Sequence, residues 1–418
     1  MIAQEPFRSL CRLQEAWSAL STKIRPLSPR RVSVLSACGR VLAEDVVAPI
    51  DVPPFDRAAM DGYAVRAEDV EGASFSSPRI LRLRGSVEIG VCPRERIGPG
   101  EAVRIDNGAL LPEGADAVVP LEYVSERGEY VEIYSSVPKW GNVSRKGEDI
   151  AKGEVVLNSG RVLTPWDVAL LKALGVSQVL VRVPRVAVIS TGAELVDDAA
   201  LLEPGKVVDT NRLMLELMLV KSGCEIIGST LLSRDDLESV STVIERFSQV
   251  ADLIVITGGC SVGRKDYVAK ALSELGDLVF HGVAIRPGMP TAAAIMGDCV
   301  AIGLPGSPAA AYIAFKLFVE PIVYLLTLRR EDIPPPLEAR TEVKIDSTPG
   351  FIDIVRVRLI SGRVVPVVRR GATVLSSISR SEGVVAVPED YEGLEEGARV
   401  RVYLHSQPWL GILEGNMP

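Results

Sequence analysis

Apolar positions in the middle of the chain alternate between two spacings. An apolar run of strand length occupies residues 252–257, and residues 185–190 and 224–231 are also expected as strands. Between them, residues 211–222 and 237–250 place apolar side chains at helical spacing. This alternation predicts a parallel, doubly wound α/β sheet. Because ligands bind such sheets at the carboxyl ends of the strands, the loops after the apolar runs are the expected place for a functional site.

The flanking regions have other patterns. Residues 9–24 and 164–175 have helical spacing, and residues 31–48 fit a short helix followed by a strand. Residues 74–147 consist of short alternating runs between Gly and Pro turns, which predicts a small β-rich domain. After a proline linker at residues 333–336, further short runs predict a C-terminal β barrel or sandwich. Its expected strands are residues 341–345, 353–360, 363–368, 384–387 and 398–404.

Length and charge limit the class of protein. At 418 residues the chain is too long for a single core, so two to four domains are expected. The net charge of −8 argues against nonspecific binding to nucleic acid or acidic membranes. Six scattered cysteines without a CxxC pair, and only two histidines, disfavour a zinc site or a disulfide framework. With neither a secretory signal nor an apolar stretch of about 18 residues, we expect a soluble cytoplasmic protein.

The loop after residues 252–257 carries the clearest chemical pattern. It reads Gly258-Gly259-Cys260-Ser261-Val262-Gly263. Glycines let a ligand approach the backbone, and the N–H groups of the following helix attract anions. The loop is neither GxGxxG nor a GxxxxGK[ST] P-loop, so dinucleotide and P-loop interpretations lose support. Two more glycine and proline loops follow, at residues 286–290 and 303–308.

Acidic residues gather in loops beside Gly or Pro. They are Asp56, Asp61, Asp149, Glu194, Asp209, Asp235 and Asp266. Anion-binding loops beside carboxylates favour a bridging divalent cation, and Mg2+ prefers such oxygen ligands. The absence of Ser-His-Asp spacing disfavours acyl transfer. Group transfer at phosphate is therefore the favoured chemistry.

Simpler structural interpretations stay open for the same residues. Asp209, Asp266 and Ser307 fit helix N-caps, as does one of Asp235 and Asp236. Glu194 fits a charge that faces solvent. Pro305 and Pro308 fit the entry to a helix over residues 309–328.

Eight stretches of the chain occur in the order of one known family. They are residues 55–64, 111–119, 145–149, 190–195, 209–211, 257–266, 286–290 and 303–308. Together they resemble the molybdopterin molybdenumtransferase family, which includes MoeA and the E domain of gephyrin. The match runs from about residue 9 to residue 404, nearly the whole chain, and this order makes the resemblance specific.

The resemblance implies a multidomain α/β plus β fold in an elongated subunit. Its α/β domain is similar to the one that binds molybdopterin in related adenylyltransferases. It also implies a homodimer, with the site between the α/β domain of one subunit and the Met-Asp-Gly-Tyr region of the other. The implied activity is Mg2+-dependent insertion of molybdate or tungstate into adenylylated molybdopterin, releasing AMP and molybdenum cofactor. The implied domains are 1–48 with 148–182 (helical and linking), 49–147 (β-rich, inserted), 183–330 (α/β) and 337–410 (C-terminal β).

Roles follow from the resemblance residue by residue. The implied catalytic acids are Asp61, Asp149, Glu194, Asp235 and Asp266. Of these, Asp235 and Asp266 also place Mg2+. The implied substrate-binding residues are Asn107, Thr191, Gly192, Asp209, Thr257, Gly258, Gly259, Ser261, Gly263, Arg286, Pro287, Gly288, Pro305, Gly306, Ser307 and Pro308.

Three positions depart from the family pattern. Asn107 replaces a threonine, Ser307 replaces an asparagine, and Ala193 stands where Asp or Asn commonly precedes the glutamate. With these changes, the sequence does not decide whether molybdate or tungstate is the preferred oxyanion. Two other functions also stay open: the adenylyltransferase step, which uses a similar α/β domain without the added β domains, and a non-catalytic scaffold of the same fold.

Overall fold

The computed structural model describes residues 10–94, 96–234, 236–260, 266–330, 333–367, 375–415 and 417. The chain divides into two compact units. The first comprises Met1–Glu44, Ser159–Thr164 and Gln178–Pro418, and the second comprises Asp45–Asn158 and Pro165–Ser177. The four-domain division expected from the sequence remains a prediction.

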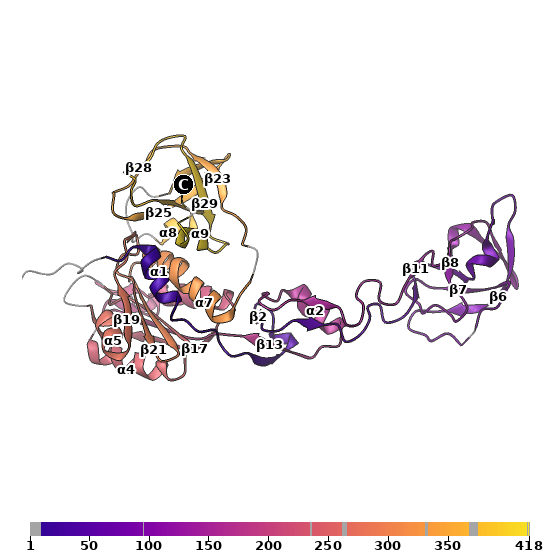
Figure 1. Cartoon of the computed structure of the whole chain (residues 1–418), viewed down its shortest axis with the longest axis horizontal. Helices are drawn as coiled ribbons and strands as arrows, with labels where there is room; N and C mark the ends of the chain where they lie inside the picture. Colours follow the sequence, from indigo (N-terminus) through magenta and orange to yellow (C-terminus); the bar gives the residue numbers. More distant parts are fainter. Residues whose placement is uncertain are drawn as a thin grey trace, which may run out of the picture. The chain divides into compact units, whose positions relative to one another are not determined.

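A six-stranded sheet forms the centre of the first unit, in the order β17–β14–β18–β22–β21–β19 (Figure 1). The strands are β14 (Arg185–Thr191), β17 (Glu225–Leu232), β18 (Leu253–Thr257), β19 (Asp277–His281), β21 (Ala292–Met296) and β22 (Cys299–Leu304). Strand β21 runs antiparallel to both of its neighbours, and the other strands are parallel to one another. The expectation of a wholly parallel sheet is therefore wrong at β21. Only Gly297 and Asp298 connect it to β22, and so short a connection joins antiparallel strands.

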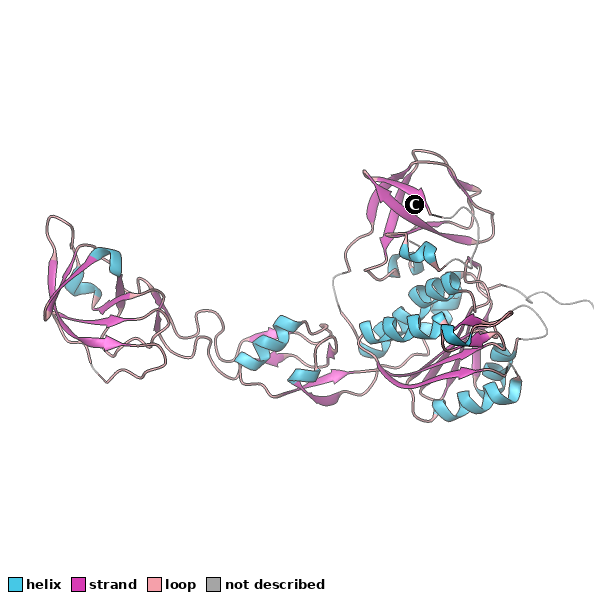
Figure 2. Cartoon of the chain, turned by 180° about the vertical axis from the view of Figure 1, so that it is seen from behind, coloured by secondary structure: helices cyan, strands magenta, loops and turns pink. Residues whose placement is uncertain are grey.

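Helices cover both faces of this sheet, as the doubly wound pattern predicts (Figure 2). Along β14, Val186 and Val188 belong to one apolar core and Ala187 and Ile189 to the other, because successive side chains of a strand point to opposite faces. The first core is covered by α1 (Leu13–Ser21), α3 (Thr210–Lys221), α6 (Pro308–Ala314), the π-helical turn η5 (Phe315–Val319) and α7 (Glu320–Thr327). The second is covered by α4 (Leu237–Ser248) and α5 (Tyr267–Leu275).

The continuous helix formed by α6, η5 and α7 corrects one expectation. Within the described residues, Pro308–Thr327 is long and apolar enough to cross a membrane, with a mean hydropathy of 1.7. The statement that the chain has no such stretch was therefore wrong. However, 89% of this segment is buried inside the protein. Its apolar character is explained by its place in the core of the α/β region.

A closed five-stranded barrel confirms the predicted C-terminal β domain. The order is β25–β26–β23–β29–β27, and β27 pairs back with β25. The strands are β23 (Leu337–Thr341), β25 (Ile352–Ile360), β26 (Arg363–Pro366), β27 (Gly383–Val387) and β29 (Arg399–Leu404). Smaller elements are β24 (Ile345–Asp346), β28 (Gly393–Leu394), α8 (Ser376–Ser379) and α9 (Leu410–Leu413). A short strand between β19 and β21, β20 (Ile285–Arg286), pairs in parallel with β25 and so anchors the loop at residues 286–290 on the barrel.

A half-buried histidine between the barrel and the long helix makes stability depend on pH. His405 contacts the Tyr312 hydroxyl through Nδ1 and the Ser381 hydroxyl through Nε2, both at 2.8 Å. Burial, and then the positive charge of Lys316, lowers the pKa of His405 from 6.5 to about 4. Between these two pH values the unfolded chain binds this proton and the folded chain does not, so this group lowers stability as the pH falls.

We therefore expect the wild type to lose stability more steeply than a His405→Gln variant between pH 6.5 and about 4. The midpoint of urea unfolding, measured across this range, checks the prediction. Parallel pH profiles for the two proteins would contradict it.

The second unit is built mainly from strands, as its short alternating runs predict. Its sheet has the order β8–β5–β7–β6–β10–β9. The strands are β5 (Gly62–Val65), β6 (Arg79–Val87), β7 (Glu101–Ile105), β8 (Ala117–Pro120), β9 (Val124–Arg127) and β10 (Tyr130–Ile133). Smaller strands are β3 (Val46–Val47), β4 (Arg57–Ala58), β11 (Val143–Ser144) and β12 (Val155–Leu157). Helix α2 (Pro165–Ala173) begins at a proline and is followed by Gly175 with φ 75°, as its sequence predicts.

The region 31–48 differs from its expected helix followed by a strand. It begins with β1 (Arg30–Ser33), continues through the 3-10 turn η1 (Val34–Ser36) and reaches β2 (Val41–Leu42). Strands β1 and β2 both pair with β13 (Gln178–Arg182). This distant partner, rather than local spacing, determines the strand conformation.

Candidate functional site

Three strand ends meet at the carboxyl edge of the α/β sheet. Strands β14, β18 and β22 are neighbours and end at Thr191, Thr257 and Leu304. They lead into the stretches at residues 190–195, 257–266 and 303–308 that the sequence singled out. The fold therefore brings these three stretches, far apart in the chain, to one edge.

Glycine is required where these loops approach one another. Gly258 has φ 88°, and a β-carbon there would lie 2.1 Å from the carbonyl oxygen of Thr191. A β-carbon on Gly306 would lie 3.4 Å from the Cα of Gly258. The backbones of the loops after β14 and β18 are thus in close contact at Gly258. The Gly258 N–H donates to the carbonyl oxygen of Leu304 at 3.3 Å, which joins this loop to the end of β22.

Asn211 ties the three segments together and was missed as a site residue. It is 8% exposed, and its Nδ2 donates to Thr257 Oγ1 at 3.0 Å and to the carbonyl oxygen of Gly306 at 2.8 Å. The Thr257 hydroxyl in turn donates to the carbonyl oxygen of Pro305 at 3.2 Å. Asn211 lies in the first turn of α3, so the amide fixes the loops after β18 and β22 against that helix. Its place two residues after the capping Asp209 was the available sequence signal.

Asp209 is buried, and its carboxylate accepts hydrogen bonds from other residues of the protein. Its Oδ1 accepts from the Arg212 backbone N–H at 3.2 Å, which confirms the N-cap of α3. Its Oδ2 accepts from Arg212 Nε at 3.0 Å and from the Ser190 hydroxyl. Asp209 therefore positions the start of α3 at the edge, while its assignment to substrate binding stays a prediction.

Asp266 lies at the same edge and begins α5. Its Oδ1 accepts from the Ala269 backbone N–H at 3.4 Å, so the capping interpretation is confirmed. Its Oδ2 lies 2.8 Å from His281 Nε2, a contact that the sequence did not suggest. Asp266 is thus a well-held carboxylate beside the glycine-lined loops.

Two other residues of the loops at this edge, Glu194 and Ser307, differ in their contacts. Glu194 is exposed, and its carboxylate lies over Gly192, where a β-carbon would meet Oε1 at 2.7 Å. Glu194 precedes the small parallel pair β15 (Leu195–Val196) and β16 (Val207–Val208). Ser307 occupies the N-cap position of α6 without a capping hydrogen bond from its side chain, and Pro308 is the first helical residue. The prediction that Pro308 lies at the entry to this helix is confirmed. Ser307 lies at the predicted N-cap position, but its side chain makes no capping hydrogen bond.

Arg286 is held by the C-terminal barrel. Its Nε and Nη2 donate to the two carboxylate oxygens of Asp353 at 2.8 and 2.6 Å, and its guanidinium carbon lies 4.9 Å from the Phe351 ring centroid. The Arg286–Pro287 peptide bond is cis, and Gly288 has φ 133°. This bidentate pair uses part of the guanidinium of a residue that the resemblance assigns to substrate binding. The loop itself is fixed in place by the pair.

Asp61, Asn107 and Asp149 belong to the second unit. Asp61 Oδ1 accepts from the backbone N–H of Asn107 at 2.8 Å, so this contact does not depend on the residue type at position 107. Asp149 is exposed, and its backbone N–H donates to Val52 at 3.1 Å. Asp56 Oδ1 accepts from the backbone N–H of Lys146 at 2.7 Å. These acids hold the loops around the Met-Asp-Gly-Tyr stretch. Their catalytic roles stay predictions.

Three predicted residues lie outside the described residues. They are Asp235, Ser261 and Gly263. The neighbouring Asp236 caps α4 by accepting from the Ser239 backbone N–H at 2.8 Å. This settles which of the two aspartates is the cap.

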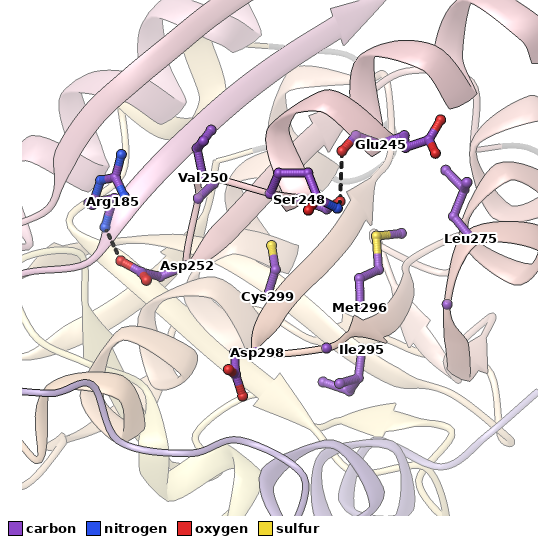
Figure 3. A pocket seen from close by; sticks show the side chains of 14 residues that line it. Arg185, Glu245, Ser248, Val250, Asp252, Leu275, Ile295, Met296, Asp298 and Cys299 are labelled. Atoms are coloured by element: carbon purple, nitrogen blue, oxygen red, sulfur yellow. Dashed lines mark hydrogen bonds between the residues drawn. The ribbon is translucent and has the colours of Figure 1, made fainter.

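A separate cavity of about 600 Å³ lies at the amino ends of the same strands (Figure 3). It is lined by Arg185 and Asp252 at the starts of β14 and β18, and by the turn at Asp298. The Arg185 backbone N–H donates to Asp252 Oδ2 at 2.7 Å. Because the cavity is at the opposite ends of the strands, it is distinct from the candidate site.

The candidate site fits a magnesium ion that arrives together with a phosphate. Among the described residues, no group of three or more His, Cys, Asp or Glu side chains is arranged to hold a metal. Mg2+ is commonly held by one or two carboxylates and completed by substrate phosphates and water. Asp266 beside an anion-accepting backbone supplies that type of donor set.

These features define a class of protein: a multidomain chain whose α/β domain brings three glycine-containing loops together at its carboxyl edge. Three family models match it in succession. They are the MoeA N-terminal region (domain I and II) over residues 11–175, a probable molybdopterin binding domain over 187–324, and the MoeA C-terminal region (domain IV) over 338–405. The fold class expected from the sequence is thereby confirmed.

Similar proteins extend over nearly all of the chain. A putative molybdopterin biosynthesis protein of Methanocaldococcus jannaschii is 36% identical over 384 residues, 90% of this chain and 92% of its own. A molybdopterin molybdenumtransferase of Haemophilus influenzae is 36% identical over 334 residues, 79% of this chain and 81% of its own. A crystal structure of a MoeA protein of Pyrococcus horikoshii has a TM-score of 0.80 and 37% identity, covering 95% of this chain and 99% of that one. The chain belongs to the MoeA family.

Proposed function

We propose that this chain is a molybdopterin molybdenumtransferase, which inserts molybdate or tungstate into adenylylated molybdopterin and releases AMP and molybdenum cofactor. Curated relatives that share about a third of its sequence are named molybdopterin molybdenumtransferase. The observation that carries the proposal within the structure is the meeting of three strand ends at Gly258 and Gly306, beside the Asp266 carboxylate.

The chemistry of this edge suits an anionic, phosphate-bearing substrate. Backbone N–H groups at the glycine loops and at the N-termini of α3 and α5 favour negative charge. The phosphates of the substrate bind at these loops, and the hydrogen bonds of Asn211 to Thr257 and Gly306 hold the loops in position. An oxygen of the oxyanion attacks the phosphorus of the adenylyl group, and the phosphoanhydride bond breaks with the pterin phosphate as the leaving group. The two thiolate sulfurs of molybdopterin then bond to the metal, the bond from the metal to the bridging oxygen breaks, and AMP leaves with that oxygen.

The proposed acids supply position and charge. Mg2+, when bound, neutralises the phosphate oxygens and screens the approaching oxyanion. Asp266 orients towards these phosphates from the start of α5, and Glu194 covers Gly192 at the end of β14. Asp61, Asp149 and Asp235 are retained as proposed acids on the resemblance alone. Most of the rate enhancement then comes from positioning charged groups rather than from a protein nucleophile.

The reaction is tested by incubating the purified protein with adenylylated molybdopterin, Mg2+ and either molybdate or tungstate. Oxyanion-dependent AMP release supports the proposal, and the faster oxyanion identifies the preferred substrate. Binding without release favours a scaffold. Formation of adenylylated molybdopterin from ATP and molybdopterin favours the adenylyltransferase alternative.

We also propose that the chain forms a homodimer through α3. Three large aliphatic residues, Leu213, Leu217 and Val220, are 59%, 61% and 57% exposed on this helix. Their spacing of four and three residues places them on one face. Contiguous exposed apolar surface of this kind marks a protein interface, and a second copy of the chain presents the same surface.

A Leu217→Glu variant is expected to shift the protein from dimer to monomer, because a charge is costly inside an apolar interface. Sedimentation velocity measures the change. An Ile360→Glu variant, which places the same charge at a 47% exposed position on the barrel, is the matched control and is expected to remain dimeric. A dimeric Leu217→Glu protein would refute the assignment of the interface to α3.

A further inference from the structure

A β-bulge in β19 turns a histidine towards the candidate site. Leu278 packs against the second core, yet Phe280 lies in the first core on the other face of the sheet. In a regular strand, residues two apart share a face. The pairing with β21 steps from Leu278 to Phe280, so Val279 is an additional residue that reverses the alternation. Bulges of this type re-aim side chains next to functional sites.

The reversal leaves the next residue, His281, on the face that carries α5. There His281 Nε2 lies 2.8 Å from Oδ2 of Asp266, the residue that begins α5. The two side chains are 29% and 16% exposed, so the contact is largely shielded from water. The pairing with Ala292 places the backbone of His281 in a strand rather than in a loop. Asp266 thus contacts His281 through one oxygen and accepts the capping hydrogen bond of α5 through the other.

We propose that His281 is a positioning residue, which fixes the Asp266 carboxylate in the orientation needed to receive the Mg2+-bound phosphates. This inference rests on the proposed function. The contact is a close approach of the ring nitrogen to the carboxylate, without the alignment of a hydrogen bond. Removing an outer group that orients a metal-ligating carboxylate typically changes metal affinity or activity by about 10- to 100-fold.

The test compares His281→Ala with His281→Gln, whose amide keeps a polar nitrogen at a similar distance from the backbone. The first readout is the Mg2+ concentration that gives half-maximal AMP release. The second is Mn2+ binding, followed by electron paramagnetic resonance in the presence of adenylylated molybdopterin and without an oxyanion. His281→Ala is expected to raise the Mg2+ requirement and weaken Mn2+ binding by about 10- to 100-fold, and His281→Gln is expected to recover most of the loss.

Asp277→Asn is the matched control on the same strand. Asp277 is 63% exposed at its side chain and pairs with Lys23 at 2.8 Å on the surface, a pair of small expected effect. An active wild type together with a His281→Ala variant of unchanged Mg2+ requirement would overturn the inference. Equal losses in the Ala and Gln variants, accompanied by a lower unfolding midpoint, would overturn it in favour of a purely structural role. A wild type that releases no AMP would instead overturn the proposed function, and Mn2+ binding would still decide the role of His281.

Discussion

An Asp266→Asn variant is expected to release AMP at least about 100-fold more slowly than the wild type, because a charge placed for the reacting phosphates is lost. The amide oxygen still accepts the hydrogen bond from the Ala269 N–H and caps α5. The unfolding midpoint is therefore expected to stay close to that of the wild type. Single-turnover AMP release and differential scanning calorimetry measure the two quantities.

Asp252→Asn is the control for this substitution. Asp252 also accepts a backbone hydrogen bond, from Arg185 at 2.7 Å, but it lies at the opposite edge of the same sheet. Its replacement is expected to leave AMP release unchanged. Equal rates for Asp266→Asn and the wild type would remove Asp266 from the reaction.

Gly258→Ala is expected to reduce both stability and activity. The added β-carbon would lie 2.1 Å from the Thr191 carbonyl oxygen, and the backbone at φ 88° is strained for any residue with a side chain. Because the clashing atom belongs to the backbone of the neighbouring strand, it cannot move away cheaply. We expect the free energy of unfolding to fall by more than about 2 kcal/mol, with loss of substrate binding at this edge.

Gly205→Ala separates the clash from the backbone strain. Gly205 has φ 90°, but a β-carbon there would meet nothing within 4 Å. We expect this control to cost only about 1 kcal/mol and to leave AMP release unchanged. Urea unfolding compares the two variants. Equal losses would show that strain alone limits position 258 and that the close approach of the loops is unimportant.

The sequence predicted those parts of the fold that depend on local pattern. Apolar runs and helical spacing identified the α/β sheet, and Gly175 after Pro165 predicted where α2 begins and ends. The direction of β21 was not predictable, because a short apolar run reads the same in parallel and antiparallel strands. The strand β1 likewise depends on β13, which is far away in the chain.

The same distinction between local pattern and distant contacts applies to the candidate site. Loops with paired glycines and capping aspartates were visible in the sequence because their chemistry is local. The contacts of Asn211, of His281 and of Arg286 with Asp353 were not visible, since each contact joins segments that only tertiary structure brings together. The β-bulge that aims His281 leaves no periodic signal that a pattern search recognises.

The central claim is tested most directly by a single-turnover experiment that follows AMP and the metal-bearing pterin together. Purified protein is mixed with adenylylated molybdopterin and Mg2+, and molybdate or tungstate is then added. The proposed transferase predicts that AMP and metal-loaded molybdopterin appear at the same rate and in equal amounts, and only after the oxyanion is added. AMP release that is independent of oxyanion, or tight binding with no release at all, would contradict it.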